Sequence, residues 1–218
     1  MTSYALAMPM DHLTIRDFTG ESSLEKEMRR AERGMLTVSV DYLGAEDLTY
    51  ATLSIDPETE NHRVVQSSPL EKDRLTFTFD SQGIADGKHL VVVEGMTIAG
   101  KKVSSQPVEL NIDNGPPSLV RIDSVVRIDS AEEGPNRNSV LVQVQATVVD
   151  DVGISLVELH DGIPDAGGRL IGASQRIEDN RCTIVAGLDY AASRIYSLYL
   201  RAYDQAGNYR VDRVTVQL

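Results

Sequence analysis

Residues 196–208 read YSLYLRAYDQAGN, and this stretch decides the fold. Tyr196, Leu198, Leu200 and Ala202 alternate with other residues, a period of two that is typical of a β-strand with one buried face. The segment ends in Ala-Gly-Asn, and Gly and Asn favour a turn because they tolerate left-handed backbone conformations. The stretch therefore predicts a half-buried strand that runs into a tight turn.

The same period of two recurs in both directions from this stretch. It is clearest at Leu36, Val38, Val40 and Tyr42 in the first half and at Val140, Val142, Val144, Ala146 and Val148 in the second. Further short strands are predicted at 48–55, 63–66, 74–79, 89–95, 103–112, 119–128, 155–160, 169–171, 182–186 and 211–218. Six or seven short strands in about 80 residues are typical of an antiparallel β-sandwich.

A proline-rich segment divides the chain into two such regions. Residues 113–117 read DNGPP, in which Asn-Gly favours a turn and the two prolines remove backbone donors and stiffen the connection. We therefore predict a first domain at residues 35–113, a hinge at 114–117 and a second domain at 118–218.

Residues 1–34 differ from the rest, and we predict that they form an N-terminal extension or linker outside both sandwiches. A short strand is predicted at 13–15. A short helix is predicted within 21–33, where acidic residues precede basic ones and so complement the helix dipole.

The two halves repeat one another in pattern. Val38 and Asp47 match Val142 and Asp151, in each case 104 residues further on. Near the end of each half, Val108 matches Val214 with an offset of 106 residues, a drift that loop insertions produce. A period near 105 residues corresponds to one domain per repeat.

Several of these segments resemble bacterial immunoglobulin-like tandem repeats. In that family, alternating apolar residues lead into Ala-x-Asp-x-Ala-Gly-Asn, as they do in residues 196–208. Residues 150–159 are similar to the bend between two earlier strands, residues 86–93 to the equivalent lead-in of the first domain, and residues 113–117 to the hinge between repeats. The resemblance covers about residues 35–218 and is weaker in the first domain, where residues 97–101 (TIAGK) replace the Asp and Asn of the motif.

The resemblance implies an all-β protein of two tandem immunoglobulin-like antiparallel β-sandwiches. Such modules occur in secreted enzymes, adhesins, surface filaments and phage virions, where they are spacers, stalks or binding units. We expect a non-catalytic structural module of a bacterial surface or secreted assembly, with protein–protein or adhesive contacts. The alternatives are an accessory C-terminal region of a large secreted hydrolase, a carbohydrate-binding module and a phage virion decoration protein.

Composition narrows the class of partner and the location. The net charge of −12 argues against a nucleic-acid partner, because binding to phosphates needs clustered Lys and Arg. No run of about 18 apolar residues is present, so no membrane insertion is expected. The single cysteine, Cys182, permits no disulfide within the chain. We expect an extracellular or cell-surface protein, or alternatively a virion protein, whose partners are other protein domains or subunits or a glycan.

Four residues are candidate calcium ligands. Asp150 and Asp151 lie in one predicted turn, and Asp204 and Asn208 lie in another. Calcium binds six to eight oxygens, with several of them from carboxylates. The alternative is that each side chain caps its own turn by accepting hydrogen bonds from nearby backbone N–H groups. No other cofactor is expected.

Catalytic motifs are missing from the sequence. The four histidines, at positions 12, 62, 89 and 160, form no H-x-x-x-H pattern, and no G-x-S-x-G sequence occurs. We therefore expect no catalytic residues and a protein that is not an enzyme.

Overall fold

The computed structural model describes residues 12–19, 31–44, 47–60, 62–66, 74–128, 139–189 and 195–217. The chain divides into two compact units between Asn114 and Gly115, called domain 1 and domain 2 below. This boundary falls within the proline-rich segment. Among the residues that the structure describes, no helix is long and apolar enough to span a bilayer.

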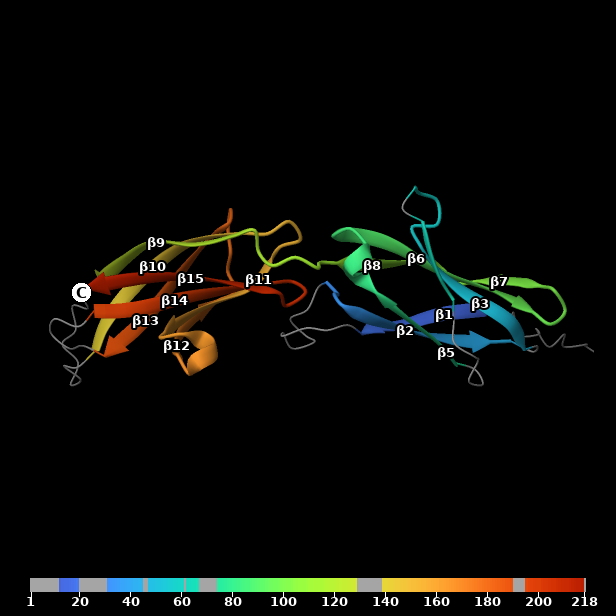
Figure 1. Cartoon of the computed structure of the whole chain (residues 1–218), viewed down its shortest axis with the longest axis horizontal. Coiled ribbons are helices and arrows are strands. Elements are labelled where there is room, and N and C mark those ends of the chain that lie inside the picture. The colour runs from blue at the N-terminus through green and yellow to red at the C-terminus, as the bar shows by residue number, and fades with distance from the viewer. Residues whose placement is uncertain are drawn as a thin grey trace, which may run out of the picture. The chain divides into compact units, whose positions relative to one another are not determined.

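Domain 1 is a sandwich of two antiparallel sheets (Figure 1). The first sheet has the order β1-β2-β5, formed by His12–Thr19, Met35–Leu43 and Arg74–Asp80. The second has the order β4-β3-β6-β7, formed by Arg63–Gln66, Leu48–Ile55, Gly87–Thr97 and Lys102–Ser104, with β8 (Val108–Ile112) also paired to β6. A 3₁₀ turn, η2 (Ser81–Gly83), connects β5 to β6. The alternating residues of β2 face the core, where Leu36, Val38 and Val40 are fully buried.

One predicted strand is broken in the structure. The segment 103–112 was expected as a single strand, but it forms β7 and β8, which pair with different parts of β6. Pro107 lies between them and has no N–H to donate to a ladder, so the strand cannot continue through it.

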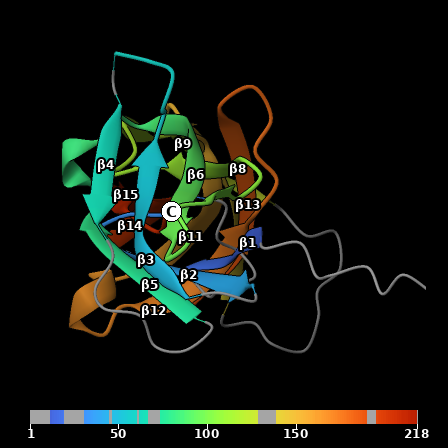
Figure 2. The ribbon, with the colours of Figure 1, turned by 90° about the vertical axis from the view of Figure 1, so that its right-hand side faces the viewer.

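The segment before Met35 belongs to domain 1, and the prediction of an extension outside both sandwiches is wrong for residues 12–19. Strand β1 pairs with β2 from His12 to Thr19, with a register shift after Ile15, and Leu13 is buried in the domain 1 core. β1 runs beside β2 in both Figure 1 and Figure 2. The Glu32 N–H also donates to the Asn111 carbonyl at 2.8 Å. Most of the helix predicted within 21–33, namely residues 21–30, lies outside the described residues.

Domain 2 repeats this arrangement. One sheet has the order β13-β10-β9, formed by Arg181–Asp189, Ser139–Val149 and Leu119–Ile128. The other has the order β12-β11-β14-β15, formed by Arg169–Ser174, Ile154–Asp161, Ile195–Asp204 and Tyr209–Gln217. A 3₁₀ turn, η3 (Pro164–Ala166), connects β11 to β12. In both domains the first, second and fifth strands form one sheet, as expected for a tandem repeat.

The core of domain 2 forms where the sequence pattern predicts it. Val142, Val144, Leu198 and Leu200 are all buried between the two sheets. Tyr196 is also buried, and its hydroxyl donates to the Asp189 carbonyl at 2.6 Å, so the ring packs without an unpaired polar end. The prediction of an all-β protein built from antiparallel sandwiches is confirmed.

Asn114 fixes the end of domain 1. Its N–H donates to Asp86 Oδ1 at 2.7 Å, and its side-chain Nδ2 donates to the carbonyls of Ser81 and Ile84. The Ser81 hydroxyl in turn donates to Asn114 Oδ1 at 2.6 Å. The Asn114 side chain is therefore used within domain 1, where it closes the turn between β5 and β6.

Candidate functional site

Two turns of domain 2 hold the predicted calcium ligands, and strand pairing brings these turns together. The first turn joins β10 to β11, and the second joins β14 to β15. Because β11 pairs with β14, Ile154, where the first turn ends, lies opposite Asp204, where the second turn begins. The Gln205 N–H donates to the Gly153 carbonyl at 3.1 Å, which links the two turns directly.

Asp204 is fully buried and holds its own turn. Its Oδ1 accepts hydrogen bonds from the N–H groups of Ala206 and Asn208, at 2.9 and 2.8 Å. Its N–H donates to the Asn208 carbonyl at 3.0 Å. Its second oxygen, Oδ2, is buried and accepts no hydrogen bond within the described part of the chain. A buried carboxylate oxygen without a partner is costly, so this atom needs a proton, a water molecule or a cation.

Asp150 holds the neighbouring turn in the same way. Its Oδ1 accepts from the N–H groups of Val152 and Gly153, at 2.9 and 2.8 Å. Gly153 has φ of +125°, and a Cβ there would lie 2.7 Å from the Gln205 amide, so the turn requires glycine. One carboxylate oxygen of Asp150 lies within 4.8 Å of one of Asp204. Two carboxylates this close repel one another unless a positive charge or a proton lies between them.

The surroundings of Asp204 raise its pKa. Burial raises the pKa of Asp204 to about 6, against hydrogen bonds from the Asn208 side chain and from the N–H groups of Asn208 and Ala206, which lower it. The negative charge of Asp150 raises the pKa of Asp204 further. Asp204 is therefore ionised at neutral pH at a cost that a bound cation would offset.

The structure brings together only part of the predicted set. Asp150 and Asp204 meet, and Asn208 is buried beside Asp204. Asp151 is exposed. The capping role expected as the alternative is realised by Oδ1 of Asp150 and Asp204. Oδ2 of Asp204 takes no part in it and has no partner among the described residues.

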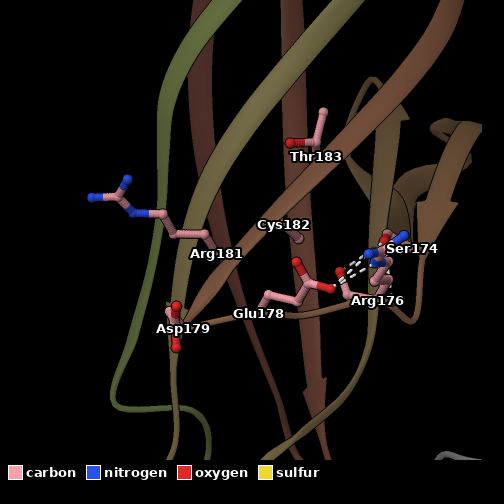
Figure 3. A pocket seen from close by; sticks show the side chains of 7 residues that line it. All are labelled: Ser174, Arg176, Glu178, Asp179, Arg181, Cys182 and Thr183. Atoms are coloured by element: carbon pink, nitrogen blue, oxygen red, sulfur yellow. Dashed lines mark hydrogen bonds and ion pairs between the residues drawn. The ribbon is translucent and has the colours of Figure 1, made fainter.

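A polar groove lies where β12 ends and β13 begins, and the sequence analysis did not find it. It has a volume of about 710 Å³, and its lining residues are Ser174, Arg176, Glu178, Asp179, Arg181, Cys182 and Thr183. Figure 3 shows Arg176 paired with Glu178 beside Ser174, whereas the Arg181 side chain extends away from that pair. The only signal in the sequence is Asp179-Asn180, a turn pair with φ of 49° and 64°.

Cys182 is an unreactive part of this groove. Its side chain is buried, and burial raises the pKa of the Cys182 thiol to about 11, so the thiolate is scarce at neutral pH.

The two buried histidines also have structural contacts. His89 Nδ1 lies 2.6 Å from Asp56 Oδ2 and Nε2 lies 2.7 Å from the Ala85 carbonyl. His160 Nε2 lies 3.1 Å from the Glu158 carboxylate.

A charged and aromatic cluster covers the outer face of the four-stranded sheet of domain 2. Arg201 donates to Glu158 through Nε and Nη2, at 3.0 and 2.8 Å, and to Asp165 through Nη1 at 2.9 Å. Its guanidinium also lies 5.1 Å from the ring centre of Tyr203 and 5.5 Å from that of Tyr209. Asp165 lies in η3, so this cluster fixes that turn to the sheet.

Known structures share this fold. Fibronectin(III)-like modules of Clostridium thermocellum CbhA match with a TM-score of 0.50 and 16% identity, over 94% of this chain and 93% of theirs. The fold is similar to that of fibronectin(III)-like modules. Two further structures match over 95% of this chain at lower TM-scores. They are a tetra-tandem repeat from the extending region of a large adhesion protein (0.34, 13% identity, 49% of that chain) and a structure concerning host cell surface retention of a 1.5-MDa bacterial ice-binding adhesin (0.38, 17% identity, 64% of that chain).

No family model and no curated protein matches the chain. The resemblance to bacterial immunoglobulin-like repeats therefore stays a prediction, whereas the sandwich fold itself is supported by the fibronectin(III)-like modules.

Proposed function

We propose that this chain is a non-catalytic structural module of a bacterial surface or secreted assembly, in which two sandwiches in series act as a spacer and offer surfaces for protein contacts. The observation that carries this proposal is that each domain has its own complete core and its own pair of sheets. Units of this kind add length to an assembly without needing one another to fold.

The polar groups of both domains support a structural role. The buried histidines, the Arg201 cluster and Asn114 all tie turns to sheets of the same domain. The groove beside β13 is lined by charged and hydroxyl side chains, and its one thiol is held in the unreactive form by burial. These features favour a rigid scaffold that makes contacts with its surface.

We further propose that the paired turns of domain 2 bind Ca²⁺ through Asp150, Asp204 and Asn208. Calcium prefers oxygen ligands. The buried Oδ2 of Asp204 is an oxygen without a hydrogen-bond partner among the described residues. Asp151 follows Asp150 directly but is exposed and is not part of this cluster, so the proposed site does not use it. A bound ion would neutralise the repulsion between the two turns and so fix the ends of β10, β11, β14 and β15.

Thermal unfolding of the full chain in Ca²⁺ and in EDTA tests the calcium site. An ion that binds only the folded state stabilises it by about 2.7 kcal/mol at a hundred times its Kd, which raises Tm by several degrees. Mg²⁺ at the same concentration is the control for ionic strength. An Asp204→Asn variant should show no response to Ca²⁺. Equal Tm values in Ca²⁺ and EDTA for the unmodified chain would remove these residues from consideration as ligands.

The spacer role is tested by asking whether the two domains unfold separately. Stretching single molecules should give two unfolding events, one for each sandwich. Labelling of Cys182, the only cysteine and buried in domain 2, should coincide with one event and not the other. A single cooperative event for the whole chain would contradict a series of independent modules.

A further inference from the structure

The outer face of the β13-β10-β9 sheet carries exposed aliphatic side chains at one end. Val185 on β13 and Val126 on β9 lie on either side of Gln143 of β10, and they are 55% and 56% exposed. Leu141, two residues earlier on β10, is 40% exposed. Single exposed aliphatic residues are common, but three on adjoining strands of one face form a patch of the kind that contacts other molecules.

A glycine beside this patch is not required by its packing against the residues that the structure describes. Gly187 on β13 lies opposite Leu141, and its φ lies outside the left-handed region. A Cβ at this position would meet no atom within 4 Å. Glycine in a strand costs about 0.5–1 kcal/mol relative to alanine. Neither backbone geometry nor packing requires it here, and a glycine in a strand permits close approach by another backbone.

The other end of the same face is cationic. Arg181 of β13 and Arg121 of β9 lie on either side of Thr147 of β10. The Thr147 hydroxyl and Arg121 Nε donate to Asp123, at 2.6 and 2.8 Å. The Thr147 hydrogen bond and then Arg121 hold the pKa of Asp123 below its usual value, so Asp123 is a carboxylate. Within the described residues, the Arg181 guanidinium makes no hydrogen bond or ion pair, so this end of the face carries two arginines and only one carboxylate.

These residues define one continuous surface, here called the β10 face: Val126, Leu141, Val185 and Gly187 at its aliphatic end, and Arg121, Asp123, Thr147 and Arg181 at its cationic end. We propose that the β10 face binds an extended acidic segment of a partner protein. The partner's apolar side chains pack on the aliphatic end, and its carboxylates pair with Arg121 and Arg181. This inference rests on the proposed contact role of the chain and names the chemistry of the partner.

Charge and size favour this occupant. The chain carries a net charge of −12, so a surface with surplus arginine selects an acidic partner. From Leu141 to Thr147 the face runs about 20 Å along β10, and it spans about 10 Å from β13 to β9, at 3.4 Å per residue and 4.8 Å per strand. A face of this size is smaller than the roughly 800 Å² per partner of a standard protein complex, and it suits a single extended segment.

The same face is poorly suited to a glycan. Its described residues include no aromatic ring on which a sugar could stack, and half of it is aliphatic. A glycan ligand is therefore treated as an outcome of the test, not as the proposal.

The test is a titration of the ¹⁵N-labelled full chain followed by NMR amide shifts. The probe is a synthetic peptide of alternating Glu and Val residues, and the control is the same peptide with Lys in place of Glu. We expect the Glu–Val peptide to shift amides of β13, β10 and β9 around Val126, Leu141 and Val185, with an affinity that falls as salt is added. The Lys–Val peptide should shift none of them. Oligogalacturonate is titrated in the same way and tests whether the face binds a glycan.

Variants separate binding from stability. Gly187→Val adds a side chain beside Leu141, where a Cβ meets no described atom within 4 Å. It should leave Tm unchanged or higher while weakening peptide binding at least tenfold. Arg181 is exposed, and the Arg181→Gln variant removes one positive charge from the face. It should weaken peptide binding several-fold. Arg213→Gln, an exposed arginine on β15 of the other sheet, is the matched control and should leave binding unchanged.

Several outcomes would overturn the proposal. These are amide shifts away from the β10 face, equal shifts with the Lys–Val peptide, stronger shifts with oligogalacturonate, and full binding by the Gly187→Val variant. Calcium stabilisation and separate unfolding of the domains are measured without the peptide. Loss of this inference would therefore leave the proposed spacer role standing, and the two failures can be told apart.

Discussion

The acidity of Asp204 leads to a specific pH dependence of stability in the absence of calcium. Burial raises the pKa of Asp204 from 3.8 to about 6, and the charge of Asp150 adds to the shift. The folded state therefore holds this proton more tightly than the unfolded state does. Stability from this group is complete below pH 3.8 and is lost as pH rises through about 6. A shift of about two pKa units corresponds to about 3 kcal/mol.

Urea unfolding of the full chain in EDTA measures this effect. Labelling of Cys182 with a dithiodipyridine, which reacts in acid as well as at neutral pH, reports the unfolding of domain 2 alone because this buried thiol is the only cysteine. Between pH 4 and pH 7 the free energy of unfolding of domain 2 should fall by about 2.4 kcal/mol, because part of the total of about 3 kcal/mol is already lost at pH 4. Ca²⁺ should remove most of that decline at pH 7, because it compensates the ionised carboxylate.

Asp204→Asn isolates this group from the other acids. The amide oxygen keeps the hydrogen bonds from Ala206 and Asn208, and the group no longer ionises. The variant should lack the decline and should exceed the unmodified chain in EDTA at pH 7 by up to about 3 kcal/mol. A decline of the same size in both proteins would refute the assignment of the pH dependence to Asp204.

The remaining predictions concern packing and charge within single domains. Leu200→Ala should destabilise domain 2 by about 2–5 kcal/mol in the Cys182 labelling assay, because Leu200 is fully buried; a neutral result would contradict the register of β14. Arg201→Lys should cost about 1–3 kcal/mol by the same measure, because lysine cannot donate twice to Glu158. Burial raises the pKa of Asp56, but hydrogen bonds from His89 and the Leu90 N–H outweigh it and hold that pKa below 3.8. Asp56→Asn should therefore lower the Tm of domain 1 at pH 7, and the difference should vanish as pH falls below 3.8; a constant difference would exclude the carboxylate charge as its cause.

Local patterning predicts the core strands because burial alternates with a period of two. Val142 and Val144 on β10, and Leu198 and Leu200 on β14, face the core as that period requires. Strand β1 was only partly foreseen, because Leu13 and Ile15 give too short an alternation to indicate a partner. Its partner β2 lies beyond residues 20–34, and pairing across such a distance leaves no local trace in sequence.

The candidate sites were likewise predictable where they depend on local sequence and unpredictable where they depend on strand pairing and burial. Turn chemistry identifies Asp150 and Asp204 as residues that cap turns, and both do so. Their proximity depends on the pairing of β11 with β14, and the unpartnered Oδ2 depends on burial, so neither could be read from residue types. The β10 face could not be predicted from the sequence for a related reason. Its residues come from three strands, and Gly187 becomes informative only when the space around it is known.

The place of β1 in domain 1 matters to anyone who shortens this chain. Trimming it to begin at Met35 would remove the strand that covers one side of β2 and would uncover a row of N–H and carbonyl groups beside fully buried residues such as Val38 and Val40. An unpaired strand of that kind is a template for pairing with other chains, so the trimmed protein should aggregate. A chain that retains residues 12–19 keeps this edge closed and should remain monodisperse.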